Sequence, residues 1–394
     1  MPINPFYLKA LPDSADELFC NRVDELSALV KMAKSKNDVV IYAPRRFGKT
    51  SLVRRVQRRL AAEGAITIFV DFSGIGSVNV VATRLAAAVY EVTHGNENLW
   101  KKAIRVLTSF RPVMRPSSDG MNIEITAEVA AGRTGIELLD AIMKELQVFV
   151  NESDRLVNVV FDEFQEILVL PDAQNIEAIM RTHIQQYQAS HFFVGSQRRL
   201  LQNMFKDEHR PFFRSSLDFN LKEITSDHFV PFIVDLFAKG GKKLPDGIAK
   251  MLVRMVRCHP HYTIKLCYHV FEAAADEVSG DDIYAGFASL LADEHMLYES
   301  MLQAIPPQQK LLLRALAKEP TDKLLAKDYV RKHDLGSSSA ISHSTKQLLN
   351  LDYIEEGDDK IWKVVDPVFG FWLANGESVR LRKSFSMAVG SLRN

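Results

Sequence analysis

Short apolar runs rich in Val, Ile and Phe alternate with longer amphipathic stretches through residues 1–224. Such runs predict strands that are buried on both faces, and apolar residues spaced three or four apart predict the helices between them. The expected strands cover residues 39–42, 67–71, 156–162, 191–197 and 218–221, and the expected helices cover about 23–34, 49–62, 78–92 and 136–149. This alternation indicates an α/β fold, in which a parallel sheet lies between two layers of helices.

The segment from about 96 to 132 departs from that pattern. Turn signals occur at Arg111-Pro112, Arg115-Pro116 and Asp119-Gly120, and residues 123–129 alternate between apolar and polar. Alternation with period two predicts a half-buried strand. We expect an inserted strand or hairpin at the edge of the core.

Beyond Thr225 the periodicity becomes helical. Four helices are expected, at 226–238, 246–257, 262–276 and 281–301, and they predict a helical lid. After a linker at 305–307, three helices precede a hairpin at 353–365, which predicts a winged-helix domain; its second and third helices are expected at 323–332 and 338–349. The expected domains are therefore a core at 1–224, a lid at 225–304, a winged helix at 305–376 and a tail at 377–394.

Composition places the chain among ordinary globular proteins. It has 394 residues, 47% hydrophobic and 25% charged, with a formal net charge of zero, so no global charge imbalance favours nucleic acid or an anionic membrane. The three cysteines form no C-x-x-C pair, which fits a reducing cytoplasm. No basic head with an apolar run opens the chain, and no apolar stretch approaches the roughly 20 residues of a membrane span. We expect a cytoplasmic protein that does not enter a membrane.

The first candidate site is the loop between the first strand and the helix that begins at Lys49. Consecutive backbone N–H groups at a helix N-terminus can surround a polyphosphate, Lys49 would reach its β- and γ-phosphates, and Thr50 would hold Mg²⁺. Ala43 stands where the phosphate-loop pattern has glycine, a small cost if φ there is negative. The expected nucleotide-binding residues of the loop are Pro44, Arg45, Arg46, Phe47, Gly48, Lys49, Thr50 and Ser51.

The second candidate site is formed by residues at the ends of two later strands. Asp162 and Glu163 follow a β-branched run, where Asp162 would anchor Mg²⁺ and Glu163 would polarise an attacking water. The alternative is a simple helix N-cap, which also favours acidic residues. Ser196 or Gln197, after the next strand, would hydrogen-bond the γ-phosphate or that water.

Several arginines and lysines could bind a neighbouring copy, a nucleic acid or an acidic protein, and the sequence does not decide among these partners. Arg210 or Arg214 would serve in trans as an arginine finger on a neighbour's γ-phosphate, or would be an ordinary surface arginine. The helix after the loop carries four arginines that would contact a phosphate backbone or an acidic partner, or simply face water: Arg54, Arg55, Arg58 and Arg59. The third helix of the winged-helix domain offers only His343 and Lys346, which favours packing or protein binding over DNA, although Arg380, Arg382 and Lys383 follow in the tail.

Three motifs together resemble one family. Phe19-Cys20-Asn21-Arg22 with Glu25-Leu26 resembles the opening F-x-G-R-x-x-E-L of AAA+-related ATPases. Residues 43–52 are similar to their G-P-R-R-x-G-K-T-S-L, and Asp366-Pro367-Val368-Phe369 with Trp372-Leu373 is similar to their closing D-P-x-F-x-x-W-L. The chain resembles the archaeal-type ATPases of the STAND class over nearly its whole length.

That resemblance implies a P-loop core with sheet order 5-1-4-3-2, an ATP- and ADP-binding site and a role as a nucleotide-controlled switch. By the same resemblance, Lys49 and Thr50 form the Walker A pair and Asp162 and Glu163 the Walker B pair. Ser196 takes the sensor position, Arg22 belongs to the nucleotide site and Pro260 to the lid motif. Asn21, Ala43 and Cys258 each replace a family glycine.

Three functions are compatible with these features. The first is a Mg²⁺-dependent, slow ATPase that couples its nucleotide state to lid and winged-helix position and to a protein partner or a homo-oligomer. The second is an ATP-dependent DNA-binding initiator or transposition helper. The third is a nucleotide-bound scaffold that does not hydrolyse ATP.

Overall fold

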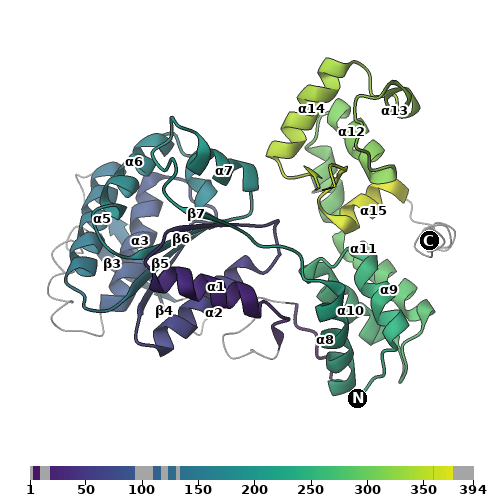
Figure 1. Cartoon of the computed structure of the whole chain (residues 1–394), viewed down its shortest axis with the longest axis horizontal. Coiled ribbons are helices and arrows are strands. Elements are labelled where there is room, and N and C mark those ends of the chain that lie inside the picture. The colour runs from purple at the N-terminus through teal and green to yellow at the C-terminus, as the bar shows by residue number, and fades with distance from the viewer. Residues whose placement is uncertain are drawn as a thin grey trace. The chain divides into compact units, whose positions relative to one another are not determined.

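The computed structural model describes residues 3–8, 18–93, 110–116, 123–129, 134–357 and 359–375 (Figure 1). Contacts divide the chain into two compact units. The first consists of Arg22–Arg45 and Lys49–Leu221, and the second of Met1–Asn21, Arg46–Gly48 and Lys222–Asn394.

The first unit is built on a five-stranded parallel sheet in the order β2-β5-β6-β1-β7. Its strands are β1 (Val39–Tyr42), β2 (Ile66–Asp71), β5 (Val157–Asp162), β6 (Ser190–Gly195) and β7 (Leu217–Asn220). Counted along the chain, the order is 2-3-4-1-5, which is the expected 5-1-4-3-2 from the opposite edge. Every residue of β1, β5 and β6 is buried, as their Val- and Phe-rich sequences predict, although β5 and β6 also bury the polar side chains of Asn158, Ser190 and His191.

Helices cover the two faces of this sheet (Figure 1). They are α1 (Val23–Lys34), α2 (Lys49–Ala62), α3 (Val78–Thr93), α5 (Gly135–Asn151), α6 (Ala173–Ile184) and α7 (Arg198–Lys206). One hydrophobic cluster joins alternate residues of the strands, such as Val159 and Phe161, to Leu85 of α3, Leu139 of α5 and Met180 of α6. Because alternate side chains of a strand face opposite sides, this cluster identifies the face that α3, α5 and α6 cover.

Two features of the first unit bear on the predicted insertion and on the second candidate site. The segment predicted as an insertion contains an antiparallel pair, β3 (Phe110–Pro116) with β4 (Ile123–Val129), which forms its own two-stranded sheet. The hairpin prediction is confirmed for these strands, while 94–109, 117–122 and 130–133 lie outside the described residues. Between β5 and β6, the sequence pattern missed the 3₁₀ helix η2 (Phe164–Val169) and also helix α6.

The described residues of the second unit form helices and one hairpin. Its first four helices are α8 (Ser226–Lys239), α9 (Asp246–Met255), α10 (Pro260–Ala273) and α11 (Gly280–Gln303). They precede α12 (Pro307–Lys318), α13 (Lys327–Lys332), α14 (Ser338–Asn350), the antiparallel strands β8 (Ile354–Glu356) and β9 (Trp362–Val364), and α15 (Pro367–Asn375). The predicted helix at 323–332 was too long, because helical structure begins only at Lys327.

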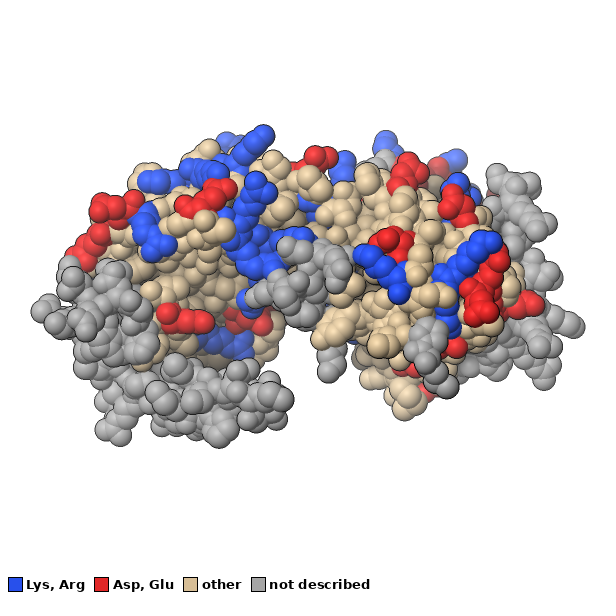
Figure 2. Space-filling view, turned by 90° about the horizontal axis from the view of Figure 1, so that it is seen from below, with Lys and Arg blue, Asp and Glu red and all other residues tan. Residues whose placement is uncertain are grey.

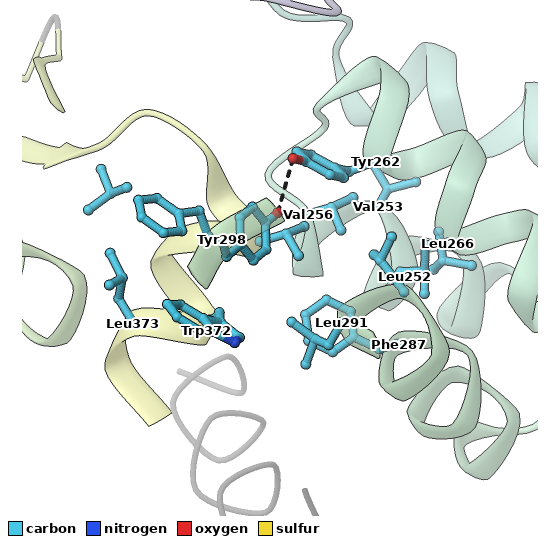
Figure 3. Packing of buried hydrophobic residues seen from close by; sticks show 14 of the residues in the cluster. Leu252, Val253, Val256, Tyr262, Leu266, Phe287, Leu291, Tyr298, Trp372 and Leu373 are labelled. Carbon is cyan, nitrogen blue, oxygen red and sulfur yellow. Dashed lines mark hydrogen bonds between the residues drawn. The ribbon is translucent and has the colours of Figure 1, made fainter. Parts of the chain in front are cut away.

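A single hydrophobic cluster runs through the whole second unit, from Phe229 of α8 to Leu373 of α15. Tyr298 of α11 lies between the two sets of helices: its hydroxyl is 3.0 Å from that of Tyr262, and its ring contacts those of Phe369 and Trp372 (Figure 3). The predicted lid and winged helix therefore share one core.

Candidate nucleotide site

The loop before α2 adopts the backbone conformation that its sequence allows. Arg46 and Gly48 have positive φ values of 62° and 84°, whereas Ala43, which replaces the pattern's glycine, does not have a positive φ. Alanine at this position therefore carries no left-handed strain. Of the other predicted loop residues, Phe47 is buried, Arg45 and Thr50 are exposed, and Pro44 and Ser51 are partly buried.

Lys49, the first residue of α2, turns its side chain back along the loop. Its Nζ donates to the carbonyl oxygens of Ala43 and Pro44, each at 3.0 Å, and the residue is only 5% exposed. The helix N-terminus contributes further positive partial charge at the same place. The ammonium group and the helix end together make this region a site for an anion such as a phosphate.

Thr50 and Asp162 meet although they are 112 residues apart. Thr50 Oγ1 donates to Asp162 Oδ2 at 2.6 Å, and Asp162 is the last residue of β5. Burial raises the pKa of the Asp162 carboxyl, and the hydrogen bond from Thr50 opposes that shift. A cation beside this carboxylate would favour its charged form.

These two oxygen donors fit Mg²⁺, which is usually held by one or two protein oxygens together with phosphate oxygens and water. Among the residues that the structure describes, there is no group of three or more His, Cys, Asp or Glu side chains that could form a metal cage. A metal ion at Thr50 and Asp162 would therefore complete its coordination with phosphate or water oxygens.

Glu163 leaves the strand in the left-handed conformation, with φ 49° and ψ 43°. It precedes η2, but its side chain makes no capping hydrogen bond, so the simple N-cap alternative does not describe its role. Instead, Glu163 Oε2 accepts a hydrogen bond from Ser196 Oγ at 3.0 Å and another from Gln165 Nε2. Ser196 thus contacts Glu163 directly, a contact that the sequence did not indicate.

The two candidate finger arginines differ in their surroundings. Arg210 Nη2 donates to Glu177 Oε1 at 2.6 Å, and Glu177 is fully buried in α6. Burial raises the pKa of Glu177 to about 7, and the neighbouring guanidinium opposes this shift. Arg214 has a φ of 52°, and its guanidinium lies 5.0 Å from the ring centre of Phe213. Because Arg210 is held by Glu177, the finger hypothesis now rests on Arg214.

Two further predicted residues lie at the starts of helices. Arg22 precedes α1 with a φ of 70° and is paired with Glu25 at 2.8 Å. Pro260 is the first residue of α10 in the second unit. Asn21 and Cys258, which replace family glycines, have φ values of 55° and 53°, so both adopt the left-handed conformation that glycine favours.

The arginines of α2 are partly engaged within the first unit. Arg54 lies over the ring of Phe69 at 3.9 Å, and Arg59 lies 3.8 Å from Glu63. Figure 2 shows basic side chains gathered along the middle of the first unit's described surface, whereas acidic and basic side chains adjoin on that of the second unit. The arginines therefore have local partners as well as exposure to solvent.

Together, these observations define the class of protein. A parallel sheet of this order, a phosphate loop that leads into α2, and carboxylates at the end of the strand next but one to β1 are the arrangement of a P-loop ATPase. Residues 19–259 match the family described as an ATPase domain predominantly from Archaea, and the chain belongs to this family. Residues 296–375 match a probable winged helix domain.

Solved structures share this fold. A Walker-type ATPase of Pyrococcus abyssi is similar with a TM-score of 0.68 and 16% identity, covering 93% of this chain and 99% of that one. The Aeropyrum pernix ORC2 protein, in ADPNP–ADP complexes, has a TM-score of 0.58, 14% identity and coverage of 99% and 98%. The ORC1 protein of the same organism, in complex with DNA, has a TM-score of 0.50, 15% identity and coverage of 96% and 97%.

Two other comparisons complete the description. Comparison with curated protein sequences yields no match. Among the helices of the described residues, none combines the length and the apolar character needed to cross a bilayer.

Proposed function

We propose that the protein is a slow, Mg²⁺-dependent ATPase of the STAND class that works as a molecular switch. In this proposal, ATP and ADP favour different positions of the second unit and so control binding of a protein partner or assembly of a homo-oligomer. The observation that carries it is the cluster of Thr50, Asp162, Glu163 and Ser196 beside Lys49, in a chain of an ATPase family.

Each residue of this cluster has a distinct proposed task. Lys49 and the loop N–H groups bind and orient the phosphates, while Thr50 and Asp162 hold Mg²⁺. The metal ion, when bound, neutralises phosphate charge. Glu163 acts as the general base that accepts a proton from the attacking water, and Ser196 orients its carboxylate. Arg22 and Pro260 contribute to nucleotide binding, and Arg214 is the proposed finger for a neighbouring copy.

The shared core of the second unit supports a switch rather than two independent moving parts. Because α8 to α15 pack around one hydrophobic cluster, a nucleotide-dependent movement would carry the lid and the winged helix together. We propose that the protein acts in the cytoplasm on a partner that recognises this unit.

Two substitutions test the site. Lys49→Ala is expected to weaken ATP binding at least tenfold, because the phosphates lose a positive charge. Glu163→Gln is expected to retain ATP binding but to lower kcat by about a hundredfold or more, because the general base is removed. Nucleotide titration and phosphate release, each with Mg²⁺ and with EDTA, measure both effects.

The outcomes separate the hypotheses. If Lys49→Ala leaves ATP affinity unchanged and Glu163→Gln leaves turnover unchanged, the proposed site is wrong. If ATP binds but single-turnover experiments show no Glu163-dependent release of phosphate, the protein is a non-hydrolysing scaffold. An increase in the protein's size in solution with a non-hydrolysable ATP analogue, but not with ADP, would support nucleotide-dependent assembly.

A second candidate function is an ATP-dependent DNA-binding initiator, which the winged helix and the similarity to the ORC1 structure favour. Against it, several basic residues of the winged-helix region are paired with acids, as in Lys332–Glu319 and Lys363–Glu355. Duplex binding with ATP at two salt concentrations tests this function. Binding that weakens steeply with salt would support the initiator, and its absence would exclude it.

A further inference from the structure

Gln165 touches the proposed general base, yet neither the sequence motifs nor the family resemblance identified it. It is the second residue of η2 and only 1% exposed. Its Nε2 donates to Glu163 Oε2, the same oxygen that accepts from Ser196. Two donors, one from η2 and one from the residue after β6, therefore converge on one carboxylate oxygen, and no described residue donates to Oε1.

The orientation of the Gln165 amide follows from its surroundings. Its Oε1 is buried and has no hydrogen-bond partner among the described residues. Turning the amide over would bring this oxygen against the Glu163 carboxylate and lose the donor, so the NH₂ group must face Glu163.

Gly195, at the end of β6, provides the space for this amide. A Cβ atom built on Gly195 would lie 1.9 Å from Gln165 Oε1 and 2.8 Å from Leu201 Cδ1. The glycine is therefore needed for close approach and not for its backbone angles. Both atoms are the far ends of flexible side chains, so a methyl group at Gly195 would displace the amide of Gln165 and the tip of Leu201 before it moved the backbone.

We propose that Gln165 is a positioning residue for ATP hydrolysis, and that Gly195 makes room for it. Gln165 and Ser196 fix Glu163 through Oε2, which leaves Oε1 to accept the proton of the attacking water. Glu163 needs this support because it lies in a left-handed turn, outside the sheet that holds Asp162. This inference rests on the proposed ATPase function.

Gln165→Met tests the role, because it preserves the length of the side chain and removes the donor. We expect kcat to fall about tenfold or more, with ATP affinity and KM changed less than twofold. Gly195→Ala should reproduce this loss, and in a Gln165→Ala background it should have little further effect on kcat, since only the contact with Leu201 Cδ1 remains. In a Glu163→Ala background, Gln165→Met should shift the urea midpoint less than it does in the native chain, a readout independent of turnover.

Gln57→Met is the matched control. Gln57 is also buried in the first unit, where its Nε2 donates to Ile68 O at 2.9 Å and to Asn158 Oδ1 at 3.1 Å, away from Glu163. It should lower the urea midpoint and leave kcat per folded molecule unchanged. If Gln165→Met behaves like this control, or if its midpoint shift is the same with and without Glu163, the inference is wrong. If the native chain shows no Glu163-dependent hydrolysis, the proposed function itself fails.

Discussion

Glu177 is a buried carboxylate of α6 that has no role in the proposed hydrolysis. Through Arg210 it connects α6 to the loop that carries Arg214. Its contact with Arg210 at 2.6 Å fixes one arginine inside the first unit. Backbone hydrogen bonds continue from there, because Phe213 N donates to Arg210 O at 3.1 Å and Arg214 N donates to Phe205 O at 2.9 Å. The pair thus anchors the segment that positions the proposed finger.

This pair predicts a pH-dependent stability. Burial raises the pKa of Glu177 to about 7 in the folded state, above the ordinary 4.5, so the folded chain binds more protons between these values. The free energy of unfolding contributed by Glu177 should therefore fall as pH rises from about 5 to 8. Relative to Glu177→Gln, the native chain should lose about 2 kcal/mol of its free energy of unfolding as the pH rises from about 5 to 8. Urea unfolding of both proteins across this range measures the difference. Parallel pH dependences of the two proteins would contradict this expectation.

Among single residues, the sequence predicted the functional groups better than their contacts. Thr50 and Asp162 were both expected at a metal site, and the structure brings them together. Gln165 was missed because one glutamine after Asp162-Glu163-Phe164 is unremarkable without its neighbours. The signal was an amide placed two residues after the proposed base, where the left-handed turn at Glu163 directs it back to the carboxylate.

Among the elements, α15 shows how a local cap and a long-range contact depend on one side chain. Asp366 Oδ1 accepts from the backbone N–H groups of Val368 and Phe369, each at 2.9 Å, and Oδ2 accepts from the Tyr262 hydroxyl. Burial raises the pKa of this carboxyl, which the hydrogen bonds oppose. The start of α15 is therefore held by α10 as well as by its own cap.

Removing this cap should destabilise the second unit. Asp366→Ala is expected to lower its free energy of unfolding by about 2–3 kcal/mol, because two backbone donors and the Tyr262 hydroxyl lose an acceptor. Asp366→Asn, which keeps an oxygen for the cap, should cost less. Asp359→Ala, at an exposed turn where Asp359 accepts from Ile361 N, serves as the control in urea unfolding. Equal losses for Asp366→Ala and Asp359→Ala would refute the proposed role.

Strand positions followed closely from the sequence, because the Val-, Ile- and Phe-rich runs of β1, β5 and β6 stand out even where a single polar residue such as Asn158 interrupts them. Their order in the sheet did not follow from periodicity and came only from the family resemblance. Helix α6 was missed because it lies between two clear strands, and because the polar Glu177 and His183 interrupt its buried stripe. The early start predicted for α13 failed because Thr321 forms a β-bridge with Trp362 and a turn at 324–325 precedes the helix.

At the scale of the whole molecule, the second unit behaves as one packed body. Trp372 of α15 is almost fully buried, its Nε1 donates to His295 of α11 at 3.1 Å, and its ring lies near that of Tyr298 (Figure 3). A disturbance of α15 should therefore reach the helices predicted as the lid.

Trp372→Ala provides the corresponding test. Loss of the indole should cost about 3–5 kcal/mol and speed amide hydrogen exchange in α10 and α11, but not in α5 of the first unit. Leu325→Ala, at a side chain that is 52% exposed, should leave exchange in all three helices unchanged. Faster exchange confined to α12–α15 would show that the lid and the winged helix unfold separately.

The buried polar side chains of the first unit have a consequence for folding. Ser190 Oγ donates to Asn37 O at 2.7 Å, Asn158 Nδ2 donates to Ser190 O at 3.4 Å, and Gln57 donates to Asn158. Sliding β5 or β6 by one residue would leave these groups without partners in an apolar interior, at about 1–3 kcal/mol each. These hydrogen bonds therefore destabilise misaligned sheets. They favour the strand register in which the start of α2 and the end of β5 place Thr50 against Asp162.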